Sequence, residues 1–487
     1  MTRRVRSGAV IGAVVAGCIA VAACGSGDSI LQAGNDPAPT TTSAPPVTAA
    51  PGETLPPTTP PPIATTTTTP LSSLPPCPVD ALDDVAGPVD ITFWHGLTGI
   101  LDETLGALVA EYNASQSKVR VTLENQGGYT QTIDKYVQSS QDSRPQMVLL
   151  PEYMVQQIAD SGSVIPIGAC MQADEFDSSR YLPRAMLSYR TNGVQWSMPF
   201  NVSDPVLYFN KVAFRNAGLD PEDPPVTLEE LREVSQQLVD SGAVAVGIAL
   251  DYGVDSGGGW FMEQWFARAD ELYADNGNGR LAPATRVLYA GPTGVALMTE
   301  VQSMITDGLA VSVGPNTGGQ DTLLKLADPN QPAAMAIATS AGLGTVLSVL
   351  EGGLIPGVTP ADLGVGPMPG PSPIPSAIVG GGSVYIVADK GDPQAAAAWD
   401  FIKFLTSAQT QATWAATTGY VPVRDDALDL EPLVTTYATD PRFRVAYDQL
   451  LAGDLDLASV GPVLGPLRAG GAATAGAGAA ILDGGPV

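Results

Sequence analysis

Residues 197–211 read Ser-Met-Pro-Phe-Asn-Val-Ser-Asp-Pro-Val-Leu-Tyr-Phe-Asn-Lys, and this stretch decides the fold. Pro199 and Pro205 bound a polar segment, and the apolar run 206–209 behind it is typical of a short strand. Prolines beside Asn, Ser and Asp give a stiff connection whose hydroxyl and amide groups suit the floor of a cleft. We therefore interpret the stretch as a crossing between two lobes, with a small polar ligand against it.

The chain before the crossing alternates between strand patterns and helix patterns. Strand-like segments at 89–94, 119–123 and 147–150 are separated by helix-like segments near 101–112 and 130–139. This alternation predicts a parallel sheet covered by helices, in which ligands gather beyond the carboxyl ends of the strands. The residues just past those ends are Trp94-His95, Gly128-Tyr129 and Pro151-Glu152.

The chain after the crossing predicts a second α/β lobe. Thr227–Glu230 is a capping box before a helix, and 243–250 has the composition of a buried strand. A further strand over 333–339 ends just before Ser340. A second Pro/Gly-rich crossing is expected at 364–370, followed by a strand with a glycine-rich start that a ligand can approach closely.

The first residues predict export. Arginines at positions 3, 4 and 6 precede the short apolar run 9–23, which is too short for a confident membrane-spanning helix. Val21-Ala22-Ala23-Cys24-Gly25 resembles the lipobox of bacterial lipoproteins, so we expect residues 1–24 to be the signal peptide and Cys24 to carry the lipid. Ordinary secretory cleavage at Ala23 is the alternative. The expected location is the extracytoplasmic face of the cell membrane.

Residues 25–79 are dominated by Pro, Thr, Ser and Ala and predict a disordered tether, because they cannot bury enough apolar surface to offset the ordering entropy. The remaining residues, roughly 400 in number, suit two lobes. The chain of 487 residues has 50 acidic against 23 basic residues, a net charge of −27. This balance argues against nucleic acid or an anionic membrane surface as partner.

Two cysteines remain after the signal and Cys24 are set aside. Cys77 and Cys170 are expected to pair in an oxidising exterior, with two free thiols as the alternative. The chain-entropy model assigns such a loop about 4–5 kcal/mol.

From Ile91 to about Val423 the chain resembles family 1 extracellular solute-binding proteins of ABC importers, and most of all their glycerol-3-phosphate-binding members. The resemblance is carried by segments 93–95, 199–211, 217–225, 364–366, 378–381 and 418–422. It implies an α/β, two-lobed periplasmic-binding-protein fold with three crossings, the third near 388–393. Residues 80–203 and 371–392 would form lobe I, and residues 204–370 and 393–487 lobe II.

The same resemblance implies a set of ligand-binding residues. Glu152 and the hydroxyls would bind polyol oxygens, amides near Gly381 would meet a phosphate, and two aromatic rings would stack on the ligand. The full set is Tyr129, Glu152, Ser203, Trp260, Ser340, Gly381 and Tyr420. Each has an ordinary alternative: a loop or turn residue, or a core tryptophan at a helix start. His95, the single histidine, is expected to be structural or at the cleft edge.

One departure from the family pattern concerns the phosphate. The family has a phosphate-clamping Arg seven residues after an element represented here by Leu464-Gly465, where this chain has Gly471. Either Arg468 substitutes for it or the clamp is absent, and a bidentate Arg is the usual specific partner of phosphate. An absent clamp weakens the case for a phosphate ester and makes a sugar competitive. The resemblance keeps glycerol-3-phosphate or a glycerophosphodiester as the first expected ligand, and a mono- or oligosaccharide as the second.

The sequence predicts a binder that breaks no bond, and no cofactor or metal. One histidine excludes His-rich zinc motifs, and no Walker A loop or G-x-S-x-G elbow occurs. An exported hydrolase that uses an unrecognised carboxylate pair is the remote alternative. The expected partners are a small solute, the permease and ATPase subunits of an ABC importer, and the membrane through the lipid anchor. We expect a monomer.

Overall fold

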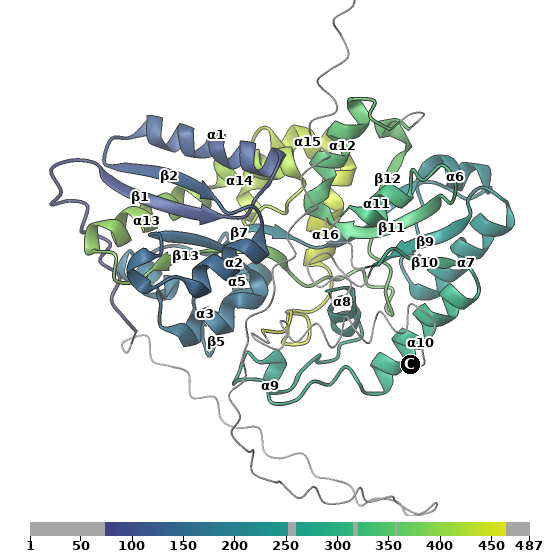
Figure 1. Ribbon diagram of the computed structural model, residues 1–487, viewed down its shortest axis with the longest axis horizontal. Helices are drawn as coiled ribbons and strands as arrows, with labels where there is room; N and C mark the ends of the chain where they lie inside the picture. Colours follow the sequence, from purple (N-terminus) through teal and green to yellow (C-terminus); the bar gives the residue numbers. More distant parts are fainter. Residues whose placement is uncertain (1–73, 252–259, 315–319, 356–357, 464–487) are drawn as a thin grey trace, which may run out of the picture. The chain divides into compact units, whose positions relative to one another are not determined.

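Two β-sheets organise the chain, and the stretch 197–211 supplies one strand to each (Figure 1). The structure is a computed structural model that describes residues 74–251, 260–314, 320–355 and 358–463, all within one compact unit, residues 64–487. The predicted signal peptide with Cys24 and most of the predicted tether lie outside the described residues. So do Leu464-Gly465, Arg468 and Gly471.

The first sheet has six strands in the order β2-β1-β3-β13-β4, with β7 also paired to β13. Strands β1, β2 and β3 are parallel, whereas β13 runs antiparallel to β3, β4 and β7. The strands are β1 (Val89–His95), β2 (Val119–Asn125), β3 (Met147–Pro151), β4 (Val164–Ile165), β7 (Met198–Ser203) and β13 (Gly380–Val387). All of β3 and β7 is buried, as expected for strands covered on both faces.

Helix α1 of this lobe buries one apolar stripe against the first sheet. In α1 the stripe is Leu105, Leu108, Val109 and Tyr112, at helical spacing. The helices are α1 (Ile100–Ser115), α2 (Tyr129–Gln138), α3 (Val155–Ser161), α4 (Ile167–Ala173), α5 (Pro183–Ser188) and α13 (Asp392–Leu405). A small hairpin of β5 (Arg190–Thr191) and β6 (Val194–Gln195) leads into β7.

The second sheet has five strands in the order β10-β9-β11-β8-β12. These are β8 (Pro205–Asn210), β9 (Val246–Leu250), β10 (Ala310–Ser312), β11 (Ala333–Thr339) and β12 (Leu363–Pro367). Its helices are α6 (Lys211–Asn216), α7 (Leu228–Asp240), α8 (Trp260–Arg268), α9 (Asp275–Asn278), α10 (Pro292–Thr306), α11 (Asp321–Lys325) and α12 (Leu343–Glu351). The capping box at Thr227–Glu230 is confirmed, since each side chain bonds the other residue's backbone.

The chain passes between the sheets three times, which confirms the predicted α/β class and two-lobed architecture. Asp204 alone separates β7 from β8, and residues 368–379 separate β12 from β13. The third passage runs through α14 (Ala408–Thr418) and α15 (Leu433–Thr439) to α16 (Val445–Leu451), which packs on β8 and β12.

The third crossing lies later in the chain than expected. Helix α13 packs on β1 and β13 of the first sheet, and its Asp400 accepts a 2.6 Å hydrogen bond from Tyr112 of α1. The lobe boundary predicted at residue 393 therefore does not match the packing of α13. The helix has a continuous apolar face over 395–405, and that pattern does not tell which of two sheets it covers.

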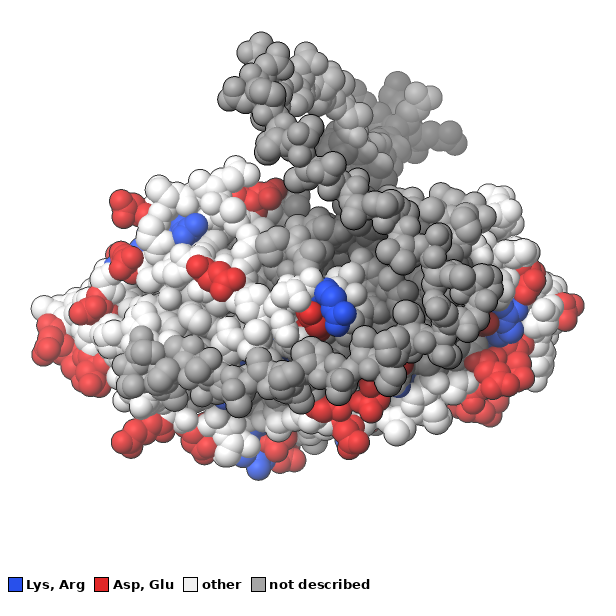
Figure 2. Space-filling view, turned by 90° about the horizontal axis from the view of Figure 1, so that it is seen from below, with Lys and Arg blue, Asp and Glu red and all other residues white. Residues whose placement is uncertain are grey.

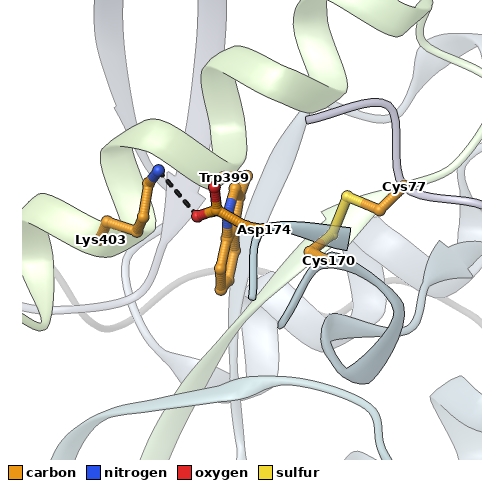
Figure 3. Close-up of a disulfide and its surroundings, with 5 residues drawn as sticks. All are labelled: Cys77, Cys170, Asp174, Trp399 and Lys403. Carbon is orange, nitrogen blue, oxygen red and sulfur yellow. Dashed lines mark hydrogen bonds and ion pairs between the residues drawn. A yellow bond between two sulfur atoms is a disulfide. The ribbon is translucent and has the colours of Figure 1, made fainter. Parts of the chain in front are cut away.

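A disulfide joins Cys77 to Cys170 of α4, the two cysteines expected to pair (Figure 3). It closes a loop with a sequence separation of 93 residues. Close by, Asp174 accepts a hydrogen bond from Lys403 Nζ at 2.9 Å, drawn as a dashed line in Figure 3, and another from Trp399 Nε1 at 2.8 Å. The start of the described chain is thus tied to α4, and the end of α4 is tied to α13.

Three buried glutamines bind backbone groups at the crossings. Gln449 of α16 accepts from Met368 N and donates to Pro205 O, both at 2.7 Å, so one side chain joins the first two crossings. Gln264 binds both backbone groups of Ile378, and Gln411 binds Val423 N and Leu405 O. Crossing segments leave part of their backbone without a sheet partner, and these amides supply the missing donors and acceptors.

Candidate functional site

The start of β13 brings together the ends of two other strands of the first sheet. Gly382 pairs with Pro151, the last residue of β3, on one side and with Asn201 of β7 on the other. Glu152 follows β3 directly, and Ser203 ends β7 opposite Gly380. Several of the predicted ligand residues therefore lie around one short glycine segment, at the edge where α/β sheets bind ligands.

Asn201 is the centre of the polar contacts at this edge. Its Nδ2 donates to the hydroxyl of Tyr129 at 2.7 Å and to the hydroxyl of Tyr420 at 3.0 Å. The side chain is fully buried, and no described residue donates to its Oδ1. Tyr129 begins α2 and Tyr420 follows α14, so one amide holds two phenols from distant parts of the chain.

The glycines of β13 make this arrangement sterically possible. A Cβ on Gly381 would lie 2.0 Å from the carbonyl oxygen of Asn201, and the φ of Gly381 is +94°. A Cβ on Gly382 would lie 2.8 Å from Asn201 Oδ1 and 2.9 Å from the Tyr129 hydroxyl. Both positions thus require glycine for the polar cluster to have this geometry.

Tyr420 is fixed by the turn that ends α14. Gly419 has a φ of +89°, and a Cβ there would lie 2.6 Å from the carbonyl oxygen of Ser340. The Tyr420 ring stacks on Trp414, with centroids 5.6 Å apart and an interplanar angle of 24°. Val421 N then donates to Val202 O at 2.7 Å, which holds the segment against β7.

Burial keeps both phenols of the cluster protonated. Burial raises the pKa of Tyr129 well above its usual value, and the pKa of Tyr420 is raised for the same reason. The hydrogen bonds from Asn201, and at Tyr420 also one with Tyr129, act in the opposite direction, and the negative charge of Glu152 adds to the increase at both rings. The two hydroxyls are therefore neutral hydrogen-bond donors at physiological pH.

A buried arginine lies in the electrostatic field of Glu152. Arg280 donates to the carbonyl oxygens of Ser188 at 2.9 Å and of Arg190 at 3.1 Å, and its Nε donates to Gly461 O at 3.0 Å. Burial lowers its pKa to about 9, and the charges of Tyr189 and Glu152 oppose this decrease. Its guanidinium thus brings positive charge close to the polar cluster.

Ser340 contacts Asp204, the residue between β7 and β8 in the first crossing. Its N–H donates to Asp204 O at 2.9 Å, and its Oγ accepts from Asp204 N at 3.4 Å. Ser340 follows β11 directly, so it links the second sheet to the residue at which the chain leaves the first. Its carbonyl group also lies beside Gly419, which connects Ser340 to the Tyr420 turn.

The comparisons with known proteins agree with this architecture. The family model of bacterial extracellular solute-binding proteins matches residues 107–444. This chain belongs to that family. Among its relatives, the sn-glycerol-3-phosphate-binding periplasmic protein of Brucella melitensis is 28% identical over 352 residues, covering 69% of this chain and 74% of the relative. That of Shigella flexneri is 27% identical over 367 residues, covering 74% and 80%.

Solved structures of solute-binding proteins share the fold of this member of the family. The cyclic α-maltosyl-1,6-maltose binding protein of Arthrobacter globiformis has a TM-score of 0.64 at 22% identity, covering 82% of this chain and 94% of that chain. UgpB of Mycobacterium tuberculosis, in complex with glycerophosphocholine, has a TM-score of 0.62 at 21% identity, covering 82% and 99%.

Some predicted positions of this solute-binding protein stand apart from the cluster. Trp260 begins α8, but its side chain lies outside the described residues. His95 is buried rather than at an edge, with Nε2 3.7 Å from Asp102 Oδ1, and burial lowers its pKa while Asp102 opposes the decrease. Trp94 donates to Glu124 at 2.8 Å, and Lys135 lies 3.9 Å above its ring, so both partners hold it structurally.

The residue that the sequence reasoning missed is Asn201. It was noted only as part of the polar crossing, although it is the one amide in a strand that is otherwise apolar up to Ser203. A polar side chain in a fully buried strand needs partners, and that requirement was the available signal. Tyr189 was also missed, and its buried hydroxyl, near Glu152 and Tyr420, has no described hydrogen-bond partner.

Three general observations concern the surface, possible metal ligands and the described helices. Acidic side chains are spread along the edges of the face in Figure 2, in keeping with the net charge of −27. Within the described ranges, no group of three or more His, Cys, Asp or Glu side chains is arranged to hold a metal ion. Of the helices in the described part of the chain, none is long and apolar enough to cross a membrane.

Proposed function

We propose that this chain is the receptor of an ABC importer for glycerophosphoryl compounds, either glycerol-3-phosphate or a glycerophosphodiester. The observation that carries the proposal is the buried cluster of Asn201, Tyr129 and Tyr420 beside Glu152, at the converging strand ends. Neutral phenol donors suit phosphate-ester oxygens, and a carboxylate suits the hydroxyls of glycerol or a cationic head group. The curated relatives are named for binding sn-glycerol-3-phosphate, which supports this ligand class.

The further members of the proposed site are Ser203, Trp260, Ser340 and Gly381. Ser203 and Ser340 supply hydroxyls at the two ends of the first crossing, and the backbone at Gly381 is open to close approach because it lacks a side chain. Contacts from both sheets at once favour a closed arrangement of the lobes, which is how a ligand shifts such an equilibrium. The closed form would then deliver the solute to the permease and its ATPase.

We propose that the receptor acts as a monomer, anchored through a lipid on Cys24 to the extracytoplasmic face of the membrane. The lipobox-like sequence around Cys24 and the Pro/Thr-rich residues 25–79 support this arrangement. Labelling cells with a radioactive fatty acid tests it: the wild-type protein should incorporate the label, and the Cys24→Ala variant should not. Equal labelling of both proteins would contradict lipidation at Cys24.

Calorimetry of the full mature domain tests the ligand class. We expect saturable binding of glycerol-3-phosphate or glycerophosphocholine, and weaker binding of maltose and maltotriose. Tyr129→Phe should weaken the binding about ten-fold, the value of one hydrogen bond to a charged group. The matched control is Tyr112→Phe, which removes a phenol bonded to Asp400 away from the cluster and should leave the affinity unchanged.

A mono- or oligosaccharide is the second candidate ligand, and the fold shared with maltose-type binding proteins favours it. Saturable maltodextrin binding with no response to glycerophosphoryl compounds would reverse the order. Mass spectrometry of the bound ligand separates a receptor from the remote alternative, an exported hydrolase: we expect the ligand to be recovered unchanged, and turnover would overturn the proposal.

A further inference from the structure

Asn201 has a hydrogen-bonding pattern that an ordinary core asparagine lacks. Its two amide hydrogens serve two phenol oxygens, at 2.7 Å on Tyr129 and 3.0 Å on Tyr420. Its Oδ1 is buried, and no described residue donates to it. A core asparagine normally satisfies its acceptor, because a buried unpaired oxygen costs about 1–3 kcal/mol.

The direction of these two hydrogen bonds determines what the phenols offer. A phenol has one proton and can both donate and accept. When its oxygen accepts from Asn201, its proton points elsewhere and remains available as a donor. Since burial raises the pKa of both phenols, the protons stay in place. The amide thus sets two neutral donors in a fixed orientation.

We propose that Asn201 is the positioning residue of the binding site: it orients the hydroxyls of Tyr129 and Tyr420 so that both donate to acceptor oxygens of the ligand. This inference rests on the proposed receptor function and adds to it a residue that acts through the two tyrosines. The ligand group that fits is an oxygen that only accepts hydrogen bonds, such as that of a phosphate ester. A ligand that presents hydroxyl groups fits the two phenol donors less well, because each hydroxyl also needs an acceptor for its own proton.

The surrounding backbone supports this role. Gly381 and Gly382 leave room beside the Asn201 carbonyl oxygen, Asn201 Oδ1 and the Tyr129 hydroxyl, and a Cβ at either glycine would approach one of these atoms to 2.9 Å or less. The bond from Val421 N to Val202 O fixes the Tyr420 segment next to Asn201. The tyrosines come from α2 and from the turn after α14, so the amide coordinates groups that no single element brings together.

The first test is Asn201→Asp, which keeps the volume but turns the hydrogen-bond donor into an acceptor. We expect glycerophosphocholine binding to weaken about 100-fold at pH 7.5, the product of two hydrogen bonds of about ten-fold each. Binding should partly recover at lower pH, where the introduced carboxyl becomes protonated and can donate again. The wild-type protein should show no such recovery. Binding within three-fold of wild type at pH 7.5 would overturn the proposal.

The matched control is Asn113→Asp. Asn113 binds both backbone groups of Val121, at 2.9 Å each, between α1 and β2. This substitution should lower the melting temperature and leave the affinity for glycerophosphocholine unchanged. The comparison separates a loss of stability from a loss of ligand orientation.

A double-mutant cycle keeps the proposal testable even if Asn201→Asp does not fold. Asn201→Ala should weaken binding strongly in the wild-type background and by less than about three-fold in the Tyr129→Phe/Tyr420→Phe background. Independent, additive effects would show that Asn201 does not act through the tyrosines. If the wild-type protein binds maltose instead of glycerophosphocholine, the proposed ligand class fails, and the same cycle measured with maltose still decides the role of Asn201.

Discussion

Asn201 and Asp204 lie three residues apart in the first crossing. Both are buried, but Asn201 is held through its side chain and Asp204 through its backbone. Both side chains are fully buried, and both have oxygens to which no described residue donates. Asn201 joins two hydroxyls from distant elements through its amide nitrogen. Asp204 is held instead through its backbone, by the two hydrogen bonds to Ser340. The first position orders neutral donors, whereas the second places an ionisable group at the passage between the sheets.

The electrostatic consequence is specific to Asp204. Burial raises the pKa of its carboxyl well above the usual value, and the nearby Gln449 amide and Arg184 guanidinium offset this only in part. The other titratable groups facing it are the phenols of Tyr208 and Tyr437, whose pKa values burial also raises. The Asp204 end of the stretch thus carries a carboxyl with a raised pKa, whereas the side chain of Asn201 does not titrate.

The largest loss of stability is expected from Gly381→Ala, because the added methyl group collides with the backbone of Asn201. The new Cβ meets the Asn201 carbonyl oxygen at 2.0 Å, and a φ of +94° disfavours any side chain. We expect a loss of about 4 kcal/mol or more in unfolding free energy, measured by urea denaturation. Gly162→Ala is the control, because its φ is also positive at +63° but a Cβ there would meet no atom within 4 Å beyond its chain neighbours; a loss of about 1 kcal/mol is expected there. Equal losses at the two positions would contradict the steric argument.

The next largest loss of stability is expected from Gln449→Leu, at the Asp204 end of the stretch. This change leaves Met368 N and Pro205 O without their 2.7 Å partner in a buried position. Two unsatisfied backbone groups should cost about 3 kcal/mol in unfolding free energy, measured in the same denaturation experiment. The exposed Gln236, which donates to Asp240, provides the control, and Gln236→Leu should change stability by less than about 0.5 kcal/mol.

The sequence could predict the crossing because its signals are local. Pro199 and Pro205 mark the polar connection, and the apolar run behind it marks β8. The alternation of strands and helices predicts both sheets, and the positions of Tyr129 and Glu152 follow from the rule that ligands bind at strand ends. The pairing of Cys77 with Cys170 could also be expected, since these are the two cysteines that lie after the predicted signal peptide and Cys24.

The remaining features depend on contacts between residues far apart in sequence. No local pattern can reveal the cluster, because Tyr129 and Asn201 are separated by 72 positions in the sequence, and Asn201 and Tyr420 by 219. The placement of α13 on the first sheet was missed for a related reason, because an apolar helix face does not specify its partner. The two unsatisfied carboxyl oxygens of Asp204 likewise emerge only once its surroundings are known.

A third experiment measures how the contribution of Asp204 to stability depends on pH. Because the folded pKa of Asp204 exceeds the unfolded one, the native state binds more protons than the unfolded state between these two values, and stability falls as the pH rises through that window. Asp204→Asn removes this dependence. We expect the variant to be more stable than wild type by about 2 kcal/mol at pH 8, and the difference to shrink toward pH 4, near the unfolded pKa.

Thermal unfolding of both proteins in matched buffers at pH 4, 6 and 8 measures this difference. Taking the difference between variant and wild type removes the contribution of all other titrating groups. A gap between the two proteins that is the same at pH 4 and pH 8 would show that Asp204 does not ionise differently on folding.

The smallest effect is expected from Ser340→Ala, which tests whether the two ends of the stretch are separate. The variant keeps the 2.9 Å bond from the backbone N–H of Ser340 to Asp204 O and loses only the 3.4 Å bond to its Oγ, so unfolding free energy should fall by about 1 kcal/mol. Thr339→Val is the matched control, since it removes the 3.3 Å bond to Ala341 N one residue away. If Ser340 also contacts the ligand, calorimetry should show about ten-fold weaker binding for Ser340→Ala and unchanged binding for Thr339→Val. Equal affinities of both variants would restrict Ser340 to the hinge and leave ligand contact to the Asn201 end.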